Sequence, residues 1–176
     1  MRTGWPAALY PGPMPPVRRR AARTVVVDPA GRVLLFRGHD PQRPHRYIWH
    51  TPGGGLDPGE DDRTAAQREL AEETGLVAEP GPLVWQRHLV FSFDGVEYDQ
   101  TEVFFLVEVA AAFEPDTSGH NTLEQSYMTA HGWFDVAQLR ACPDLLAPPD
   151  LADRLDQLIT AGPPEEPVQV LGAVLP

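Results

Sequence analysis

Three glutamates in one short segment carry the strongest chemical signal in this sequence. Glu69, Glu72 and Glu73 follow a run of glycines within GGLDPGEDDRTAAQRELAEETGL, which spans residues 54–76. On a helix they fall within an arc of about 100°, so their carboxylates can converge on one point. Like charges at this spacing cost roughly 0.2–0.5 kcal/mol per pair. The cluster suits a hard divalent cation such as Mg²⁺, which takes carboxylate oxygens and leaves positions for substrate phosphates.

Neighbouring residues supply other parts of such a site. The run PGGG at residues 52–55 lets the backbone approach a ligand closely, with a carbonyl as a further ligand or with amides facing a phosphate. Arg68 lies four residues before Glu72 and can also reach Glu60, so it would brace the acids. A solvated acidic helix with i,i+4 pairs and a glycine cap explains the glutamates alone equally well.

The complete spacing resembles the signature of the Nudix hydrolases. Gly54, five residues, Glu60, seven residues and then RELAEETGL at residues 68–76 match every fixed position of that 23-residue box. The preceding WHTPG at residues 49–53 also resembles the family's usual approach to the box, and a compatible order of strands and helices extends over about residues 23–139. Matches at this many fixed positions favour the catalytic interpretation over the solvated helix.

The resemblance implies an α/β protein with the Nudix fold, a mixed β-sheet sandwiched between helices. It also implies metal-dependent hydrolysis of a phosphoanhydride bond in a nucleoside diphosphate linked to another moiety, with Mg²⁺ or Mn²⁺ as cofactor. Carried over to matching positions, Glu72 and Glu73 are metal ligands, and Glu69 is a ligand or the base that deprotonates the attacking water. The backbone carbonyl of Gly53 is a further ligand. The residues that hold the loop and the helix together are Gly54, Glu60, Arg68 and Gly75.

The residue types suit this chemistry. A phosphoanhydride is kinetically inert because its negative charge repels a nucleophile. Metal ions neutralise that charge and lower the pKa of a coordinated water, while neighbouring carboxylates hold the ions and accept the proton. Repulsion among the glutamates is therefore unfavourable only when no metal is bound.

One more acid is expected at the site, because Nudix proteins often carry one on a loop outside the box. Glu124, nine residues before Trp133, is the candidate for this catalytic role, and a solvated loop glutamate is the equal alternative. Glu102 is a weaker candidate, since alternation within a strand already explains a polar residue there.

Residues that bind the substrate are less clearly indicated. Arg37, Arg43 and Arg46 precede the box and could hold a second phosphate bidentately, although a solvated loop explains them at least as well. Ser92 stands where relatives acting on ADP-ribose often carry proline and those acting on dinucleoside polyphosphates carry tyrosine, so neither subtype is indicated. The six histidines show no ligand spacing. The aromatic residues that could stack on a base, or pack in a core, are Trp85, Phe93 and Tyr98.

Composition limits the classes of function. All 14 basic residues are Arg, which excludes Schiff-base and lysine-nucleophile chemistry. The formal net charge is −11, so a general nucleic-acid binder is not expected; the Arg-rich first quarter keeps a capped RNA 5′ end as a lesser alternative. The single cysteine, Cys142, cannot form an intrachain disulfide, and no apolar run approaches the ~18 residues of a membrane helix. A cytoplasmic protein with no membrane partner is the expectation.

One domain is expected between two tails. Residues 1–16 form a Pro-rich arm, residues 17–161 the Nudix domain, and residues 162–176 a tail whose segment 168–175 could add an edge strand. The expected strands lie at residues 23–28, 32–37, 47–51, 83–93, 96–109 and 132–134. The expected helices run from Asp61 or Asp62 to Thr74, over residues 136–141, and onward from about Asp150.

The sequence as a whole indicates a Nudix pyrophosphohydrolase acting on a nucleoside triphosphate or a nucleotide-linked metabolite. The alternative is a non-catalytic Nudix-fold sensor that binds a nucleotide and regulates a partner, but such proteins usually lose box glutamates and this chain keeps all of them. A homodimer is common in the family, and the Pro-rich arm could exchange between subunits.

Overall fold

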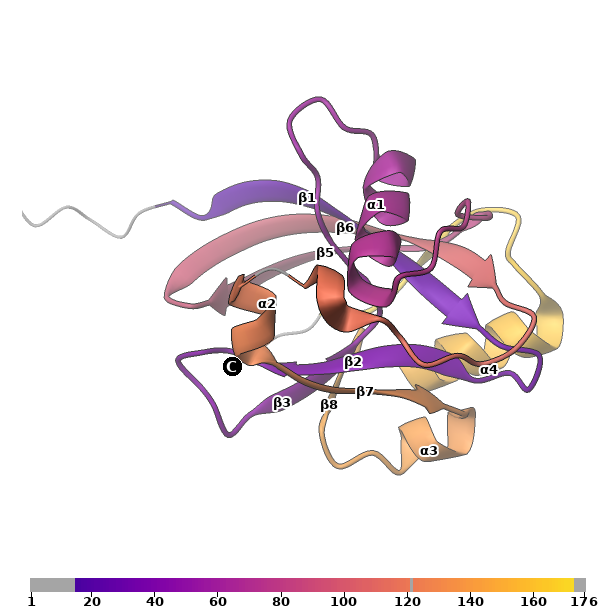
Figure 1. The fold of residues 1–176 in the computed structure, drawn as a ribbon. Helices are drawn as coiled ribbons and strands as arrows, with labels where there is room; N and C mark the ends of the chain where they lie inside the picture. Colours follow the sequence, from indigo (N-terminus) through magenta and orange to yellow (C-terminus); the bar gives the residue numbers. More distant parts are fainter. Residues whose placement is uncertain (1–14, 121, 173–176) are drawn as a thin grey trace, which may run out of the picture.

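A curved mixed sheet organises the part of the chain described in this computed structural model, residues 15–120 and 122–172 (Figure 1). Its strands are β1 (Val17–Val27), β2 (Val33–His39), β3 (Tyr47–His50), β4 (Gly53–Gly55), β5 (Leu83–Phe93), β6 (Val96–Glu108), β7 (Met128–Phe134), β8 (Leu145–Ala147) and β9 (Val168–Gln169). The helices are α1 (Asp62–Thr74), the 3₁₀ turn η1 (Thr117–Gly119), α2 (Thr122–Tyr127), α3 (Val136–Arg140) and α4 (Leu151–Ala161). The strand order is β8-β3-β2-β1-β6-β5-β9, with β4 paired to β1 and β7 paired to β2.

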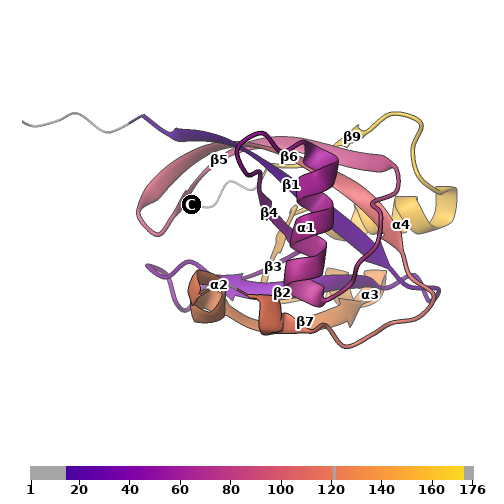
Figure 2. The same ribbon diagram turned by 45° about the horizontal axis from the view of Figure 1, so that its top comes forward.

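The sheet curls into two layers that face each other, with β1, β5 and β6 in one and β2, β3 and β7 in the other (Figure 2). Parallel pairing joins β1 to β6 along the whole of β1, from Val17 opposite Tyr98 to Val27 opposite Glu108. In contrast, β1 pairs with β2 only where Val27 lies opposite Val33. The layers therefore meet at one end and separate toward the other, which leaves room for a cavity between them.

The main hydrophobic core fills the end where the layers meet. It combines side chains from β1, β2, β5 and β6 with the apolar face of α4, including Val25, Leu35, Trp85, Phe104 and Leu155. Burial of this continuous apolar cluster is the main stabilising contribution to the fold. The packed core therefore holds the two layers together at one end, and their other end stays open.

Helix α1 begins and ends where its sequence predicts. Asp61 caps its first turn by accepting a hydrogen bond from the Thr64 amide at 2.8 Å. Gly75 ends it in the left-handed conformation, with φ of 71°. Ala65 and Ala66 pack against Ala22 of β1 and Phe105 of β6, so small residues allow the helix to approach the sheet closely. This approach brings the glutamates of α1 against β4.

The expected α/β class is confirmed, and several boundaries differ from the expectation. Strand β1 begins at Val17 rather than residue 23, because its Arg-rich first half is held by backbone pairing with β6. Strand β7 begins at Met128 rather than residue 132. The elements without a sequence counterpart are β4, β8, η1 and α2, all of six residues or fewer.

The two expected tails have different outcomes. The arm at residues 1–16 lies, apart from its last two residues, outside the described residues. In the C-terminal segment, β9 pairs in parallel with β5 and Val170 is buried in the main core, so the described part of this segment packs on the sheet. The rest of the expected strand, from residue 173, is not described. No helix among the described residues is long and apolar enough to cross a membrane.

Candidate active site

Three carboxylates from two helices meet beside the glycines of β4. Glu69 and Glu73 of α1 and Glu124 of α2 each place one carboxylate oxygen within 4.8 Å of the other two; we call these residues the carboxylate cluster. Glu69 and Glu73 are buried, and Glu124 is partly exposed. Glu73 also accepts a hydrogen bond from the Gly53 amide at 2.7 Å. Two box glutamates and the acid proposed outside the box are thus brought together.

The glycines of β4 allow this close contact. A Cβ added at Gly54 would lie 2.5 Å from Glu69 Oε1, and one added at Gly53 would lie 2.3 Å from the Ala22 carbonyl oxygen. Gly53 also has φ of 135°, which side-chain-bearing residues rarely adopt. A side chain at Gly53 would push the β4 backbone away from β1, and one at Gly54 would displace the Glu69 carboxylate. The Gly53 carbonyl, expected as a metal ligand, accepts a hydrogen bond from Arg23 Nη1 at 3.0 Å.

Arg68 connects the box loop to the helix. Its guanidinium donates to both carboxylate oxygens of Glu60, at 3.0 and 2.9 Å, and to the Gly55 carbonyl at 2.9 Å. It also binds Glu69 at 2.9 Å and Glu72 at 3.1 Å. Among the described residues, the carboxylate cluster does not include Glu72, whose side chain is 51% exposed and turned toward Arg68. The three glutamates span an arc of about 100° on the helix, and Glu72 lies at one edge of it. Its side chain can therefore point toward Arg68 instead of toward the other two glutamates.

Burial and mutual repulsion make the carboxylate cluster electrostatically unfavourable without a counterion. Burial, together with the neighbouring Glu69 charge, raises the pKa of Glu73 well above its ordinary value, and burial also raises the pKa of Glu69. Oxygen ligands from carboxylates suit Mg²⁺ and Mn²⁺. A divalent cation would supply the charge that these glutamates lack, so the residues present fit the cofactor that the box implies.

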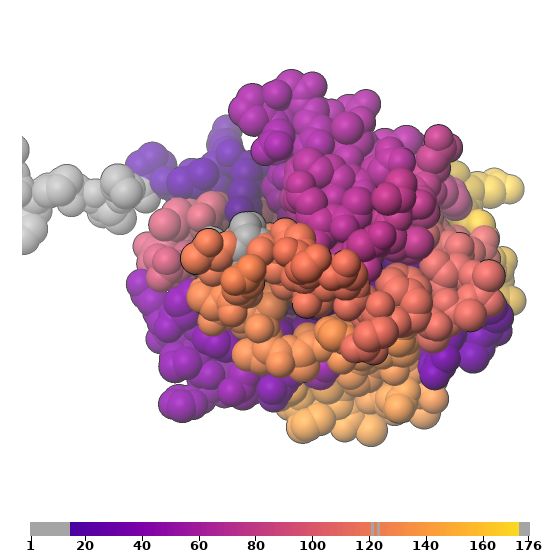
Figure 3. All heavy atoms as spheres, in the orientation of Figure 1, coloured from indigo at the N-terminus to yellow at the C-terminus, as the bar shows by residue number. Residues whose placement is uncertain are grey.

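The segment that carries Glu124 is anchored on the end of α1, and Figure 3 shows it packed along that helix. The Asp116 amide donates to the Thr74 carbonyl at 3.0 Å. The ring nitrogen Nε2 of His120, which is buried, lies 3.2 Å from the Glu73 carbonyl and donates to it. A Cβ added at Gly119 would lie 2.3 Å from the Glu72 carbonyl oxygen. These contacts fix where α2 begins and bring Glu124 to the cluster.

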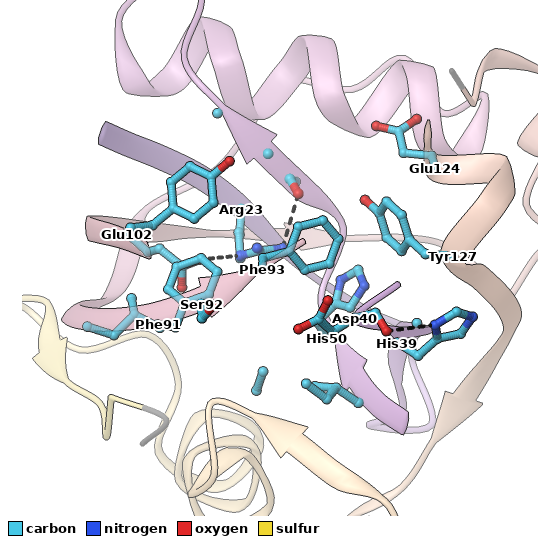
Figure 4. A pocket seen from close by; sticks show the side chains of 18 of the residues that line it. Arg23, His39, Asp40, His50, Phe91, Ser92, Phe93, Glu102, Glu124 and Tyr127 are labelled. Atoms are coloured by element: carbon cyan, nitrogen blue, oxygen red, sulfur yellow. Dashed lines mark hydrogen bonds and ion pairs between the residues drawn. The ribbon is translucent and has the colours of Figure 1, made fainter. Parts of the chain in front are cut away.

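A buried charge network lies beside the cluster, between the two layers of the sheet (Figure 4). Glu102 is 1% exposed and binds Arg23 Nε at 2.9 Å and, on its other oxygen, Arg87 Nε. The two guanidinium groups hold the pKa of Glu102 at about 2, although burial alone would raise it. Glu102 therefore stays ionised and pairs with these two arginines. Among the described residues it is not part of the carboxylate cluster, although the sequence offered it as a weaker candidate for the additional acid.

A cavity of about 390 Å³ extends from the carboxylate cluster into the space between the layers. Arg43 and Arg46, two of the three arginines that the sequence offers for substrate binding, line it. Arg37 is engaged elsewhere: its Nε donates to Asp144 at 2.8 Å, and its guanidinium lies 3.5 Å from the ring centre of Tyr47. The three arginines are consequently not brought together at one site.

The aromatic residues divide in the same way. Phe93 and Tyr98 line the cavity, whereas Trp85 is buried in the main core. Phe91 and Tyr127 also line the cavity and were not singled out from the sequence. Tyr127 follows Glu124 by one helical turn, so both extend from α2 toward the cavity (Figure 4). That spacing is the signal that could have identified Tyr127, had the helix been recognised.

His50 and Tyr127 are both neutral groups facing the cavity. Burial, together with the charge of the nearby Arg23, lowers the pKa of His50 to about 4. Its Nδ1 lies 3.1 Å from the Thr51 carbonyl, which makes Nδ1 the donor and leaves Nε2 as an acceptor. Burial raises the pKa of the Tyr127 hydroxyl, and the Glu73 charge acts in the same direction. The cavity therefore offers both an acceptor and a donor that carry no charge.

Curated proteins related to this chain match over a short region. An RNA pyrophosphohydrolase of Dinoroseobacter shibae is 46% identical over 61 residues, which are 35% of this chain and 36% of that protein. An RNA pyrophosphohydrolase of Caulobacter vibrioides is 48% identical over 63 residues, 36% of each protein. The chain thus matches these curated relatives over about a third of their length.

Solved structures match over most of the chain. A MutT protein from Methanosarcina mazei Go1 aligns with a TM-score of 0.62 and 20% identity, covering 84% of this chain and 99% of that one. A MutT NUDIX hydrolase from Burkholderia pseudomallei aligns with a TM-score of 0.57 and 26% identity, covering 80% and 98%. The sequence model of the NUDIX domain matches residues 17–158. With the box, the curled mixed sheet and this match in agreement, the chain belongs to the NUDIX domain family.

Proposed function

We propose that this chain is a divalent-cation-dependent pyrophosphohydrolase, which cleaves a phosphoanhydride bond in a nucleotide-type substrate. The observation that carries the proposal is the carboxylate cluster at one end of an Arg-lined cavity. The relatives named RNA pyrophosphohydrolase support the class of reaction. Family membership supports the use of Mg²⁺ or Mn²⁺.

Each acidic residue has a proposed role. Glu69, Glu73 and Glu124 hold the cation through the oxygens that already face one another. As a further ligand, Glu72 would have to turn away from Arg68, which Glu60 and the Gly55 carbonyl would still bind. The Gly53 carbonyl oxygen has two lone pairs, so it can accept from Arg23 and still coordinate a cation.

The residues around the cation divide the remaining work. A bound divalent cation neutralises phosphate charge and acidifies a water molecule. Glu124, the most accessible carboxylate of the cluster, would accept the proton from the attacking water on its second oxygen, the one that does not hold the cation. Arg43 and Arg46 bind the phosphates that do not react, since a guanidinium pairs with phosphate oxygens in a fixed geometry.

The test is the release of phosphate and nucleotide with Mg²⁺ from a panel of substrates. The panel contains nucleoside triphosphates, ADP-ribose, nucleotide sugars, dinucleoside polyphosphates, coenzyme A and a 5′-triphosphorylated RNA. Glu73→Gln should lower turnover at least about 100-fold, because a positioned acid or base contributes at least that much. Glu79→Gln, an exposed glutamate five residues beyond α1, is the matched control and should behave as wild type.

Two results would decide against the proposal. Equal turnover by Glu73→Gln and wild type would remove the carboxylate cluster from the reaction. No turnover of any panel member, combined with tight nucleotide binding, would favour the non-catalytic sensor instead. Retention of the fold in each variant is checked by its thermal melting curve.

A further inference from the structure

The cavity beyond the carboxylate cluster has one flat wall. Phe91 of β5 and Tyr98 of β6 are register partners in the hairpin, with stacked rings 5.5 Å apart at an interplanar angle of 28°. The Arg19 guanidinium of β1 lies 4.2 Å from the centre of the Tyr98 ring. We call these three residues the aromatic wall. Together they give a planar, polarisable surface on which another ring can stack.

The tip of the β5–β6 hairpin forms part of the rim of the same cavity. On one side, Phe93 makes an edge contact with Tyr127 of α2, with ring centres 5.3 Å apart. On the other, Asp40 Oδ1 accepts the Asp94 amide at 3.1 Å and the Gln42 amide at 3.0 Å, so it ties the hairpin to the β2–β3 loop. These two rim contacts join the hairpin to both neighbouring elements, and Figure 4 shows Phe93, Tyr127 and Asp40 around the cavity.

Size limits what can be inserted. Ligand cavities usually measure roughly 300–1,000 Å³, and this one, at about 390 Å³, is at the small end. It must accommodate the phosphates at the carboxylate cluster as well as the group that reaches the aromatic wall. A cavity at the small end of this range suits one nucleotide better than two.

We infer that the cavity encloses the base of a single nucleotide, so that the preferred substrate is a mononucleotide such as a nucleoside triphosphate and not the 5′ end of an RNA. The base stacks on the aromatic wall, and its phosphates extend to the carboxylate cluster. This inference rests on the proposed function for the reaction itself. It distinguishes the chain from the RNA pyrophosphohydrolases that it resembles over a third of their length.

The experiment compares substrates that share their first nucleotide and differ only in whether an RNA chain is attached to its 3′ side. Initial rates with Mg²⁺ are measured for each nucleoside triphosphate and for a 5′-triphosphorylated RNA octamer that begins with the same nucleotide. We expect kcat/KM for the preferred nucleoside triphosphate to exceed that of its octamer by at least about tenfold. The Glu73→Gln protein gives the background for both substrates.

A rim variant tests whether closure is the cause. Asp40→Ala removes the acceptor that ties the hairpin to the β2–β3 loop, so it should raise KM for the nucleoside triphosphate and narrow the preference over the octamer. Asp153→Ala is the matched control, because Asp153 is exposed on α4 and pairs with Arg140. It should leave the preference unchanged. A preference that survives Asp40→Ala intact would contradict the role of the rim.

Failure of this inference can be distinguished from failure of the proposed function. An octamer hydrolysed as fast as its nucleoside triphosphate, with both activities lost in Glu73→Gln, overturns the enclosed base and leaves the reaction in place. If neither substrate is hydrolysed, the proposed function fails, and calorimetric titration with the same two ligands still tests the cavity. Binding of the octamer as tightly as the nucleoside triphosphate would then overturn the inference.

Discussion

The carboxylate cluster and the aromatic wall occupy the two ends of one cavity, yet they are assembled differently. Most of the cluster is held by contacts within residues 53–76, such as Glu73 with Gly53 and Arg68 with Glu60. The wall joins residues that are far apart in sequence, with Arg19 from β1 stacked on Tyr98 from β6. A short local segment thus sets the chemistry, and long-range packing sets the shape that a substrate must fit.

The largest expected effect on kcat/KM lies within residues 53–76, where substitutions of the adjacent Gly54 and Gly55 should differ. A Cβ at Gly54 would lie 2.5 Å from Glu69 Oε1, whereas at Gly55 the nearest atom, the Arg20 carbonyl oxygen, is 4.0 Å away. We expect Gly54→Ala to lower kcat/KM by about 100-fold, because a small displacement of a catalytic group has an effect of that size. Gly55→Ala should stay close to wild type. If both variants lose the same kcat/KM in steady-state kinetics, the glycine run is intolerant of any substitution, and the contact between Gly54 and Glu69 is not the cause.

The next effect tests the one part of the cluster that is not local. A Cβ at Gly119 would lie 2.3 Å from the Glu72 carbonyl, a backbone atom, so the segment carrying Glu124 must shift. We expect Gly119→Ala to lower kcat by about 10- to 100-fold. In a Glu124→Gln background the same change should add little, because the two substitutions remove the same contribution. Fully additive losses in this double-mutant cycle would separate Gly119 from Glu124.

A smaller effect separates the arginines named from the sequence. Arg46→Ala should raise KM by about tenfold, as expected when a charged hydrogen bond to substrate is lost. Arg37→Ala should leave KM unchanged and lower only the melting temperature, because Arg37 binds Asp144 and lies over Tyr47. Substrate titrations of both variants measure this difference. A raised KM for Arg37→Ala would place that residue at the substrate after all.

The smallest expected effect is a pH-dependent change in stability. Burial holds the pKa of Glu73 well above its ordinary value of 4.5 in the metal-free protein. The unfolded chain loses this proton first, so the free energy of unfolding falls as pH rises from 4.5 toward the raised pKa of the folded state. A divalent cation binds the ionised carboxylate, so Mg²⁺ affinity rises over the same interval. Mg²⁺ should therefore raise the melting temperature more at pH 8 than at pH 5.5.

The control for this pH effect is Glu73→Gln. Glutamine does not ionise, so the difference between the two pH values should shrink in this variant. A shift from Mg²⁺ that is the same at both pH values in the wild type would mean that Glu73 is already ionised without metal.

The sequence predicts those parts of the site that depend on neighbours along the chain. The start of α1 at Asp61, its end at Gly75 and the convergence of Glu69 with Glu73 follow from capping and helical spacing. The same spacing placed Arg68 beside Glu72, one turn later, but it could not show that this contact would keep Glu72 out of the carboxylate cluster described here. The identity of the family follows from the same local pattern.

Other parts of the site depend on contacts between residues far apart in the sequence, so the sequence alone predicts them less well. Helix α2 has only six residues, and a helix so short is stable only through its tertiary contacts. Glu124 was consequently expected on a loop, and Tyr127 was missed. The first half of β1 was not predicted to be a strand because it contains three successive arginines. Their residue type does not indicate that their backbone pairs with β6. The aromatic wall could not be foreseen without that pairing.

The position of β1 has a consequence for how the site opens in solution. Around residues 21–23, β1 is bonded to β6 on one side and to β4 on the other, so it is an interior strand at the point where it carries Arg23 to the charge network. Amide protons of interior strands exchange with solvent only when the whole domain unfolds, whereas short helices exchange through small local openings. We therefore expect the floor of the cavity and β4 to belong to the slowest-exchanging unit of the molecule, and α2 to belong to a faster one. Local opening of α2 would then let substrate enter and product leave while the strands beneath the site stay folded.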